Sequence, residues 1–205
     1  MEVVAQGIQV FIPPLLIRLL ALADAKHPLI AMSEGELEVV DLLFLSVEDY
    51  QTCRYSCTPE NSLMFARTGM DGEHFSFLVQ EEAVDEQSPV IFTAPANFGG
   101  PYNVIVAENF CMFIGLLLRY GGFALGELAF NTQEAVSALS EPLESSRALN
   151  VRRYDYDTPD DKKQALEFVA NKLQIQPYTY APSEFEQLQA RYMHRLIMPP
   201  DYEAD

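Results

Sequence analysis

Three histidines, His27, His74 and His194, are the side chains of this sequence best suited to acid–base catalysis near neutral pH. His74 follows Glu73 directly and lies three residues after Asp71, so a carboxylate could orient its ring as the general base of a hydrolase. None of the three belongs to a catalytic motif, and a turn-adjacent histidine on an exposed strand face explains the same spacing. We expect no catalytic residues, and a hydrolase built on Asp71, Glu73 and His74 is the alternative.

The three cysteines do not form a recognisable metal site. Cys53 and Cys57 have the spacing of one helix face, but a structural zinc ion takes four ligands, and only the distant Cys111 remains. The carboxylates of residues 155–161 lack the spacing of a calcium-binding loop. Neither pair of consecutive glycines, at 99–100 and at 121–122, lies in a phosphate-binding loop. We expect no metal and no cofactor.

The charge of the chain limits its partners. Among 205 residues, 30 are acidic and 13 are basic, which gives a formal net charge of -17. A field of that sign repels phosphate backbones and anionic membrane surfaces, so we expect neither nucleic acid nor a membrane as a partner. Two interpretations remain: the charge serves solubility alone, or an acidic face attracts a basic protein.

The first apolar stretch is not typical of a signal peptide or a membrane span. No basic residue precedes it, and prolines at positions 13 and 14 and Arg18 interrupt it. An odd number of cysteines in a chain of this length is unlike the disulfide framework of a secreted protein. Both observations predict a cytoplasmic protein with reduced thiols.

Five short strands are expected, over residues 37–45, 62–68, 73–80, 89–93 and 103–107. Between the second and third of them, residues 69–72 (GMDG) are typical of a tight turn, because glycine and aspartate tolerate positive φ. These two strands should therefore form a hairpin. Strands that follow one another without intervening helices favour antiparallel pairing.

Two sets of side chains alternate along the strand expected over residues 73–80. The set expected in the core is Phe75, Phe77 and Val79, and the set expected on the exposed face is His74, Ser76 and Leu78. This follows because successive side chains of a strand point to opposite faces of the sheet.

Helices are expected over about residues 15–24, 108–120, 132–139, 157–173 and 183–196. The first is apolar nearly all round, which predicts burial on more than one side. The last begins with a capping-box spacing, Ser183 with Glu186. Its apolar stripe is Phe185, Leu188, Tyr192 and Leu196.

Strands grouped before helices predict an α+β fold. We expect an antiparallel-dominated sheet of about five strands flanked by helices, in a single domain over residues 1–205. Its core should cover about residues 8–140, and a helical C-terminal extension should cover about residues 141–205.

Residues 65–78 (FARTGMDGEHFSFL), 89–92 (PVIF) and 103–110 (NVIVAENF) resemble the core of the SUKH superfamily, whose bacterial members include immunity proteins against polymorphic toxins. The resemblance covers about residues 10–120, including residues 35–41 (GELEVVD). The chain lacks the tryptophan that the superfamily often carries near its early elements, and its tail from about residue 131 has no clear counterpart there. The resemblance implies a sheet flanked by helices, no catalytic residues, and a variable acidic face that neutralises a toxin such as a nuclease.

We therefore expect a non-catalytic, cytoplasmic protein-binding module that resembles an immunity protein. Its partner would be a protein with a basic face, such as a toxin domain, and Tyr50 and Tyr102 would be aromatic anchors. The residues expected to bind the partner are Glu48, Asp49, Tyr50, Asp71, Glu73, Glu81, Glu82 and Tyr102. Besides the hydrolase, the alternative is a scaffold protein that associates with itself through the apolar stripe of its last helix.

Overall fold

The structure is a computed structural model of the chain. It describes residues 2–5, 7–22, 30–33, 36–39, 42–45, 49, 55–130, 136–137, 159–179 and 181–200. Several predicted features lie outside the described residues, namely Glu48, Tyr50, Cys53, His27, most of the helix over 132–139, the first part of the C-terminal extension and the first two residues of the helix over 157–173.

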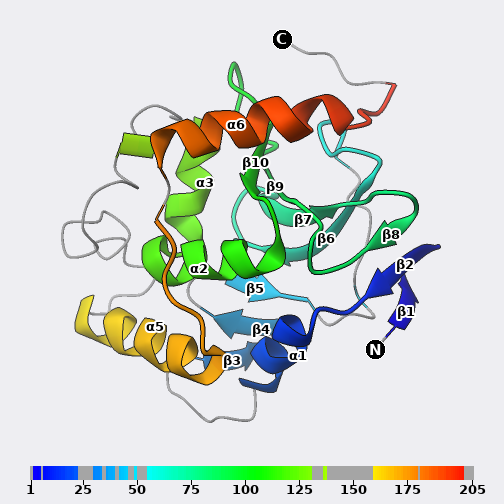
Figure 1. Cartoon of the computed structure of the whole chain (residues 1–205). Helices are drawn as coiled ribbons and strands as arrows, with labels where there is room; N and C mark the ends of the chain where they lie inside the picture. The colour runs from blue at the N-terminus through cyan, green and yellow to red at the C-terminus, as the bar shows by residue number, and fades with distance from the viewer. Residues whose placement is uncertain are drawn as a thin grey trace.

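A seven-stranded sheet forms the centre of the described structure (Figure 1). Its strands, in spatial order, are β10 (Asn103–Ala107), β9 (Val90–Thr93), β7 (His74–Leu78), β6 (Ser62–Arg67), β5 (Leu42–Phe44), β4 (Glu36–Val39) and β3 (Ile30–Ser33). Every neighbouring pair is antiparallel. With the helices described below, this confirms the predicted α+β class.

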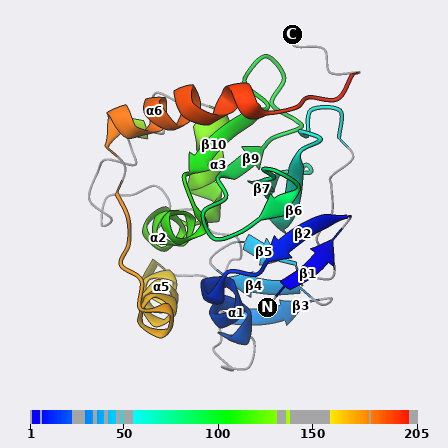
Figure 2. The ribbon, with the colours of Figure 1, turned by 45° about the vertical axis from the view of Figure 1, so that its right-hand side comes forward.

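A second, three-stranded sheet lies beside the first (Figure 2). It contains β1 (Glu2–Ala5), β2 (Ile8–Phe11) and the two-residue β8 (Ala83–Val84), and β2 pairs with β8 in parallel. The sequence predicted none of these three strands. Each has four residues or fewer, which is too short for an alternating pattern to be recognised.

The single strand predicted over residues 37–45 is wrong, because two strands occupy that segment. β4 and β5 pair antiparallel, with Leu37 opposite Phe44 and Val39 opposite Leu42. All four of these side chains are buried. In each strand one side chain, Glu38 or Leu43, is only partly buried, and a short apolar run of this kind does not show whether the chain continues straight or folds back on itself.

Five helices are described, each with its bounds in the structure. They are α1 (Pro14–Leu20), α2 (Phe110–Tyr120), α3 (Gly122–Phe130), α5 (Pro159–Leu173) and α6 (Pro182–Tyr192), and a short 3₁₀ helix, η5 (Met193–Arg195), follows α6. The prediction that α1 is buried on more than one side is wrong, because Leu16 and Leu19 are buried while Ile17 and Arg18 are exposed.

The start of α6 also differs from the prediction. Its N-cap is Ala181, and the carboxylate of Glu184 accepts a hydrogen bond from the Ala181 N–H at 3.3 Å. The predicted pairing of Ser183 with Glu186 is therefore wrong, since proline at the first helical position moves the cap two residues earlier.

Helix α3 was not predicted, and its glycines explain why. The segment GFALGELAF carries two glycines, which lower helix propensity. In the fold, Gly126 lets α3 approach the sheet closely, since a Cβ at this position would lie 3.1 Å from the Phe92 ring. Gly121, with φ of 77°, separates α3 from α2 at the predicted end of α2.

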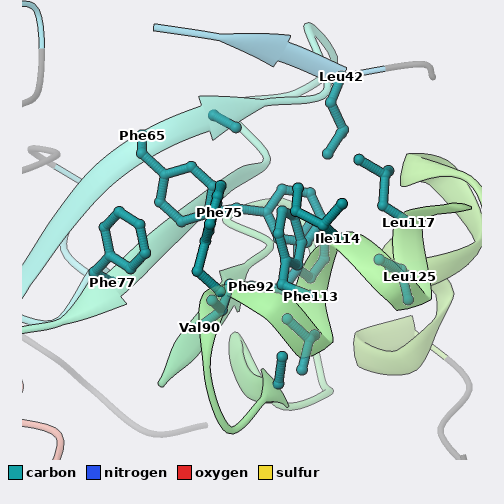
Figure 3. Close-up of a cluster of buried hydrophobic side chains, with 14 of the residues drawn as sticks. Leu42, Phe65, Phe75, Phe77, Val90, Phe92, Phe113, Ile114, Leu117 and Leu125 are labelled. Carbon is teal, nitrogen blue, oxygen red and sulfur yellow. The ribbon is translucent and has the colours of Figure 1, made fainter. Parts of the chain in front are cut away.

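The hydrophobic core lies between the sheet and helices α2 and α3 (Figure 3). At its centre the Phe65 ring lies against Phe77, with centroids 4.2 Å apart, and meets the edges of Phe110 and Phe113 at 5.7 and 5.5 Å. The apolar residues of α5 and α6 belong to the same core cluster.

The opposite face of the sheet is buried as well, so the prediction that His74, Ser76 and Leu78 are exposed is wrong. The chain around residues 55–61 covers this face and is joined to the segment that follows η5. Asn61 accepts from the N–H of Ile197 and donates to the carbonyl of Arg195, and Glu60 donates its N–H to the Ile197 carbonyl. Alternation in the sequence shows which side chains share a face, but not whether a distant segment covers it.

Candidate partner-binding surface

The turn between β6 and β7 presents Met70, Asp71 and Glu73. Gly69, Asp71 and Gly72 all have positive φ, as the turn prediction requires. Gly72 must lack a side chain, because a Cβ there would collide with the ring of Tyr55. The turn is thereby held against Tyr55, whose ring stacks on His74 with centroids 6.1 Å apart.

Three carboxylates gather near this turn, from Asp71, Glu73 and Glu127 of α3. Burial raises the pKa of Glu73, and the charges of Asp71 and Glu127 raise it further, while a hydrogen bond from the Thr68 hydroxyl at 3.0 Å opposes the rise. Arg67, at the end of β6, is the one lysine or arginine among residues 62–78. Negative charge therefore exceeds positive charge at this end of the sheet.

We expect Glu73→Gln to stabilise the fold at pH 7 by less than about 1 kcal/mol, since the carboxylate is partly exposed and screened. The folded-state pKa of Glu73 is raised above 4.5, so the ionised form lowers stability as pH rises through that pKa. The variant keeps an oxygen to accept from Thr68. Urea unfolding should show equal stabilities at pH 4 and a gap at pH 7.

The matched control for this prediction is Glu186→Gln, which changes an exposed carboxylate on α6. It removes the same charge at a position open to solvent, so at pH 7 it should change stability much less than Glu73→Gln does. A gap for Glu73→Gln that is as large at pH 4 as at pH 7 would contradict the linkage.

His74 is buried, and both of its ring nitrogens have hydrogen-bond partners. Nδ1 lies 2.7 Å from the Gly72 carbonyl, which can only accept, so Nδ1 carries the proton. Nε2 then accepts from the Thr58 hydroxyl at 3.4 Å. Burial lowers the pKa of His74, which keeps the ring neutral at pH 7.

These contacts do not assemble the carboxylate–histidine pair of the hydrolase alternative. Among the described residues, His74 bonds to Gly72 and Thr58, the Glu73 carboxylate accepts from Thr68, and Asp71 is exposed. A general base needs a polar partner and access to a substrate. The buried His74 is instead part of the packing between β7 and the segment around Thr58.

The loop between β9 and β10, residues 94–102, lies at the same end of the sheet as this turn, because β9 pairs with β7 and His74 is opposite Thr93. It extends past α6 in both views (Figures 1 and 2). Tyr102, predicted as an anchor, is half-buried at the base of the loop. Phe98, which was not among the predicted anchors, has 84% of its surface exposed.

Two further apolar side chains are exposed here, Met70 on the turn and Phe130 at the end of α3. The amide of Asn97 joins the loop to α3 by donating to the Ala129 carbonyl at 2.8 Å. We call this region the loop-end surface, defined by Tyr55, Met70, Asp71, Glu73, Phe98, Glu127 and Phe130. One feature of the sequence could have indicated Phe98 as an exposed contact residue. It lies directly before two glycines, in the loop between two strands that were predicted.

The predicted partner-binding residues do not all lie on the loop-end surface. Asp71 and Glu73 do, and Tyr102 lies at its border. Glu81 and Glu82 follow the other end of β7, where Gln9 of β2 donates its N–H to the Glu82 carbonyl. The five residues of β7 place Glu81 and Glu82 roughly 17 Å from the turn that carries Asp71 and Glu73. Asp49, the remaining described residue of the predicted set, is exposed.

The apolar stripe of the scaffold alternative is covered within the chain. Phe185, Leu188 and Tyr192 are buried in the core cluster. Between them, Gln189 accepts from the Ile105 N–H at 2.9 Å and donates to the Ile105 carbonyl at 2.7 Å, so α6 covers the edge of β10. The stripe is therefore not available to a second copy of the chain.

The described residues contain no group of three or more histidine, cysteine, aspartate or glutamate side chains that could hold a metal ion. Of the two described cysteines, Cys57 is buried and Cys111 is exposed on α2. In the same part of the chain, every helix is too short or too polar to cross a membrane.

Comparison with protein-family models, with curated proteins and with solved structures finds no match to this chain.

Proposed function

We propose that this protein is a non-catalytic binding module that holds a basic protein partner against its loop-end surface, as an immunity protein holds a toxin domain. The observation that carries the proposal is the grouping of the carboxylates of Asp71, Glu73 and Glu127 among exposed apolar side chains. Such a combination is typical of contact surfaces, where charge guides the encounter and apolar side chains hold the complex.

The net charge of -17 supports a basic partner, because the long-range field of the whole chain adds to the local carboxylates. The resemblance of residues 10–120 to the SUKH superfamily supports an immunity-type role, in which binding alone neutralises the partner. A cytoplasmic site of action agrees with the reduced thiols expected from the sequence.

The test uses the protein product of the gene beside the one that encodes this chain. We expect it to bind, with an association rate that falls as salt rises, because the Debye length shrinks from about 10 Å at 0.1 M salt to about 3 Å at 1 M. The double variant Asp71→Asn with Glu127→Gln should slow association by about fivefold at low salt. Stopped-flow measurements across a salt series supply both values.

The charge-matched control is the pair Glu81→Gln with Glu82→Gln at the other end of β7. It removes two negative charges, as the first pair does, so an equal slowing would place the effect in the overall field and not on the loop-end surface. An association rate indifferent to salt and to both pairs would mean that acidity serves solubility alone. Absence of both binding and protection would overturn the immunity role.

A further inference from the structure

Phe98 is the most exposed large apolar side chain among the described residues. A single apolar side chain on a surface is ordinary and needs no explanation. Phe98 differs because it stands at the tip of a fixed loop and is grouped with other apolar side chains. Removing the apolar surface of a phenylalanine ring from water is favourable, so a partner could gain affinity by covering it.

The loop that carries Phe98 is held in one conformation by its own hydrogen bonds. The Ala94 N–H donates to the Tyr102 carbonyl at 2.8 Å and closes the base of the loop. The buried Asn97 donates to the carbonyls of Pro101 and Ala129 at 3.1 and 2.8 Å. A contact residue held this way loses little conformational entropy on binding.

The two glycines that follow Phe98 fit the same arrangement. Gly99 has φ of 86°, a conformation that residues with a side chain rarely adopt. A Cβ at Gly100 would lie 2.6 Å from the Asn97 amide nitrogen, so only glycine lets Asn97 reach its partners. The local sequence therefore directs Phe98 outward and keeps it there.

The surroundings of Phe98 are acidic and partly apolar. Through Asn97 and Ala129 the loop is joined to the last turn of α3, which carries Glu127 and ends at the exposed Phe130. The negative charge of Glu127 raises the pKa of the Glu73 carboxyl. A partner that covers Phe98 must therefore also face negative charge.

We infer that Phe98 is the anchor of the loop-end surface and inserts into an apolar pocket, rimmed by lysine or arginine, on the partner protein. This inference rests on the proposed function and adds the residue that holds the complex and the shape of its complement. A protein partner is favoured over a membrane, because Asp71, Glu73 and Glu127 repel anionic lipid headgroups around the inserted ring.

The test needs no natural partner and uses the full chain. A phage-displayed library of random disulfide-constrained peptides is selected on the wild type, and the enriched peptides are titrated against Phe98→Ser and Phe98→Leu. We expect peptides that combine basic with apolar residues, at least about tenfold weaker binding to Phe98→Ser, and largely retained binding to Phe98→Leu. Ile197→Ser, at a side chain that is 55% exposed, is the matched control and should bind like the wild type.

Peptides without basic residues, or peptides that bind Phe98→Ser as well as they bind the wild type, would overturn the inference. So would Phe98-dependent binding to vesicles of phosphatidylcholine and phosphatidylglycerol, which would assign the side chain to a membrane. With the neighbouring gene product, slower association of the charge variants but unchanged dissociation of Phe98→Ser would overturn the anchor and leave the proposed function standing.

Discussion

Phe65→Ala should lower the free energy of unfolding by about 4 kcal/mol, the largest effect that we expect from a single substitution. The ring is fully buried and meets Phe44, Phe77, Phe110 and Phe113, which come from two strands and one helix. Truncation removes all of these contacts and leaves a cavity where the sheet meets α2, and close-packed rings cannot collapse into it without strain.

Urea unfolding followed by circular dichroism measures this loss. Phe98→Ala is the matched control, because it removes the same atoms from an exposed ring and should change stability by less than about 0.5 kcal/mol. The described aromatic packing would be contradicted by a Phe65→Ala protein that unfolds at the same urea concentration as Phe98→Ala.

Asn103→Ala should lower the free energy of unfolding by about 3 kcal/mol, because it removes two buried hydrogen bonds. The Asn103 amide donates to the Cys57 carbonyl at 2.8 Å and accepts from the Thr93 hydroxyl at 2.8 Å. It thereby fastens the segment around Cys57 to the sheet face opposite the phenylalanine core. Asn171→Ala, at an exposed position of α5, is the control and should be nearly neutral.

A double-mutant cycle separates this network from simple loss of packing. Thr93→Val removes the hydroxyl that Asn103 accepts from, so its cost overlaps with that of Asn103→Ala. The two substitutions together should cost less than the sum of their separate effects. Strict additivity would contradict the described bond between the two side chains.

The same region shows why the predicted exposure of one strand face failed. Register places Arg67, His74, Thr93 and Asn103 opposite one another across β6, β7, β9 and β10. Polar residues in such a row are typical of a solvent-facing surface. Here the row instead supplies hydrogen bonds to Cys57 and Thr58, and the covering segment comes from elsewhere in the chain.

The candidate site was predictable in part, for a related reason. The Gly69 to Gly72 turn and its carboxylates followed from local turn chemistry, which depends on neighbouring residues only. The choice of Phe98 over Tyr102 depended on which side chain the β9–β10 loop turns outward. The hydrogen bond from the Asn97 amide to the α3 carbonyl of Ala129 fixes the direction of the loop, and these two residues lie 32 positions apart in the chain.

By itself the sequence determined the α+β class, the β6–β7 hairpin, the helices α2 and α5, and the negative charge of the surface. These depend on local periodicity, turn residues and composition, all of which are present before any tertiary contact forms. Tertiary structure alone decided that both faces of the sheet are covered, that the α6 stripe packs on β10, and that Glu127 joins Asp71 and Glu73. Burial and proximity are properties of segments brought together from distant positions, and local patterns do not encode which segments meet.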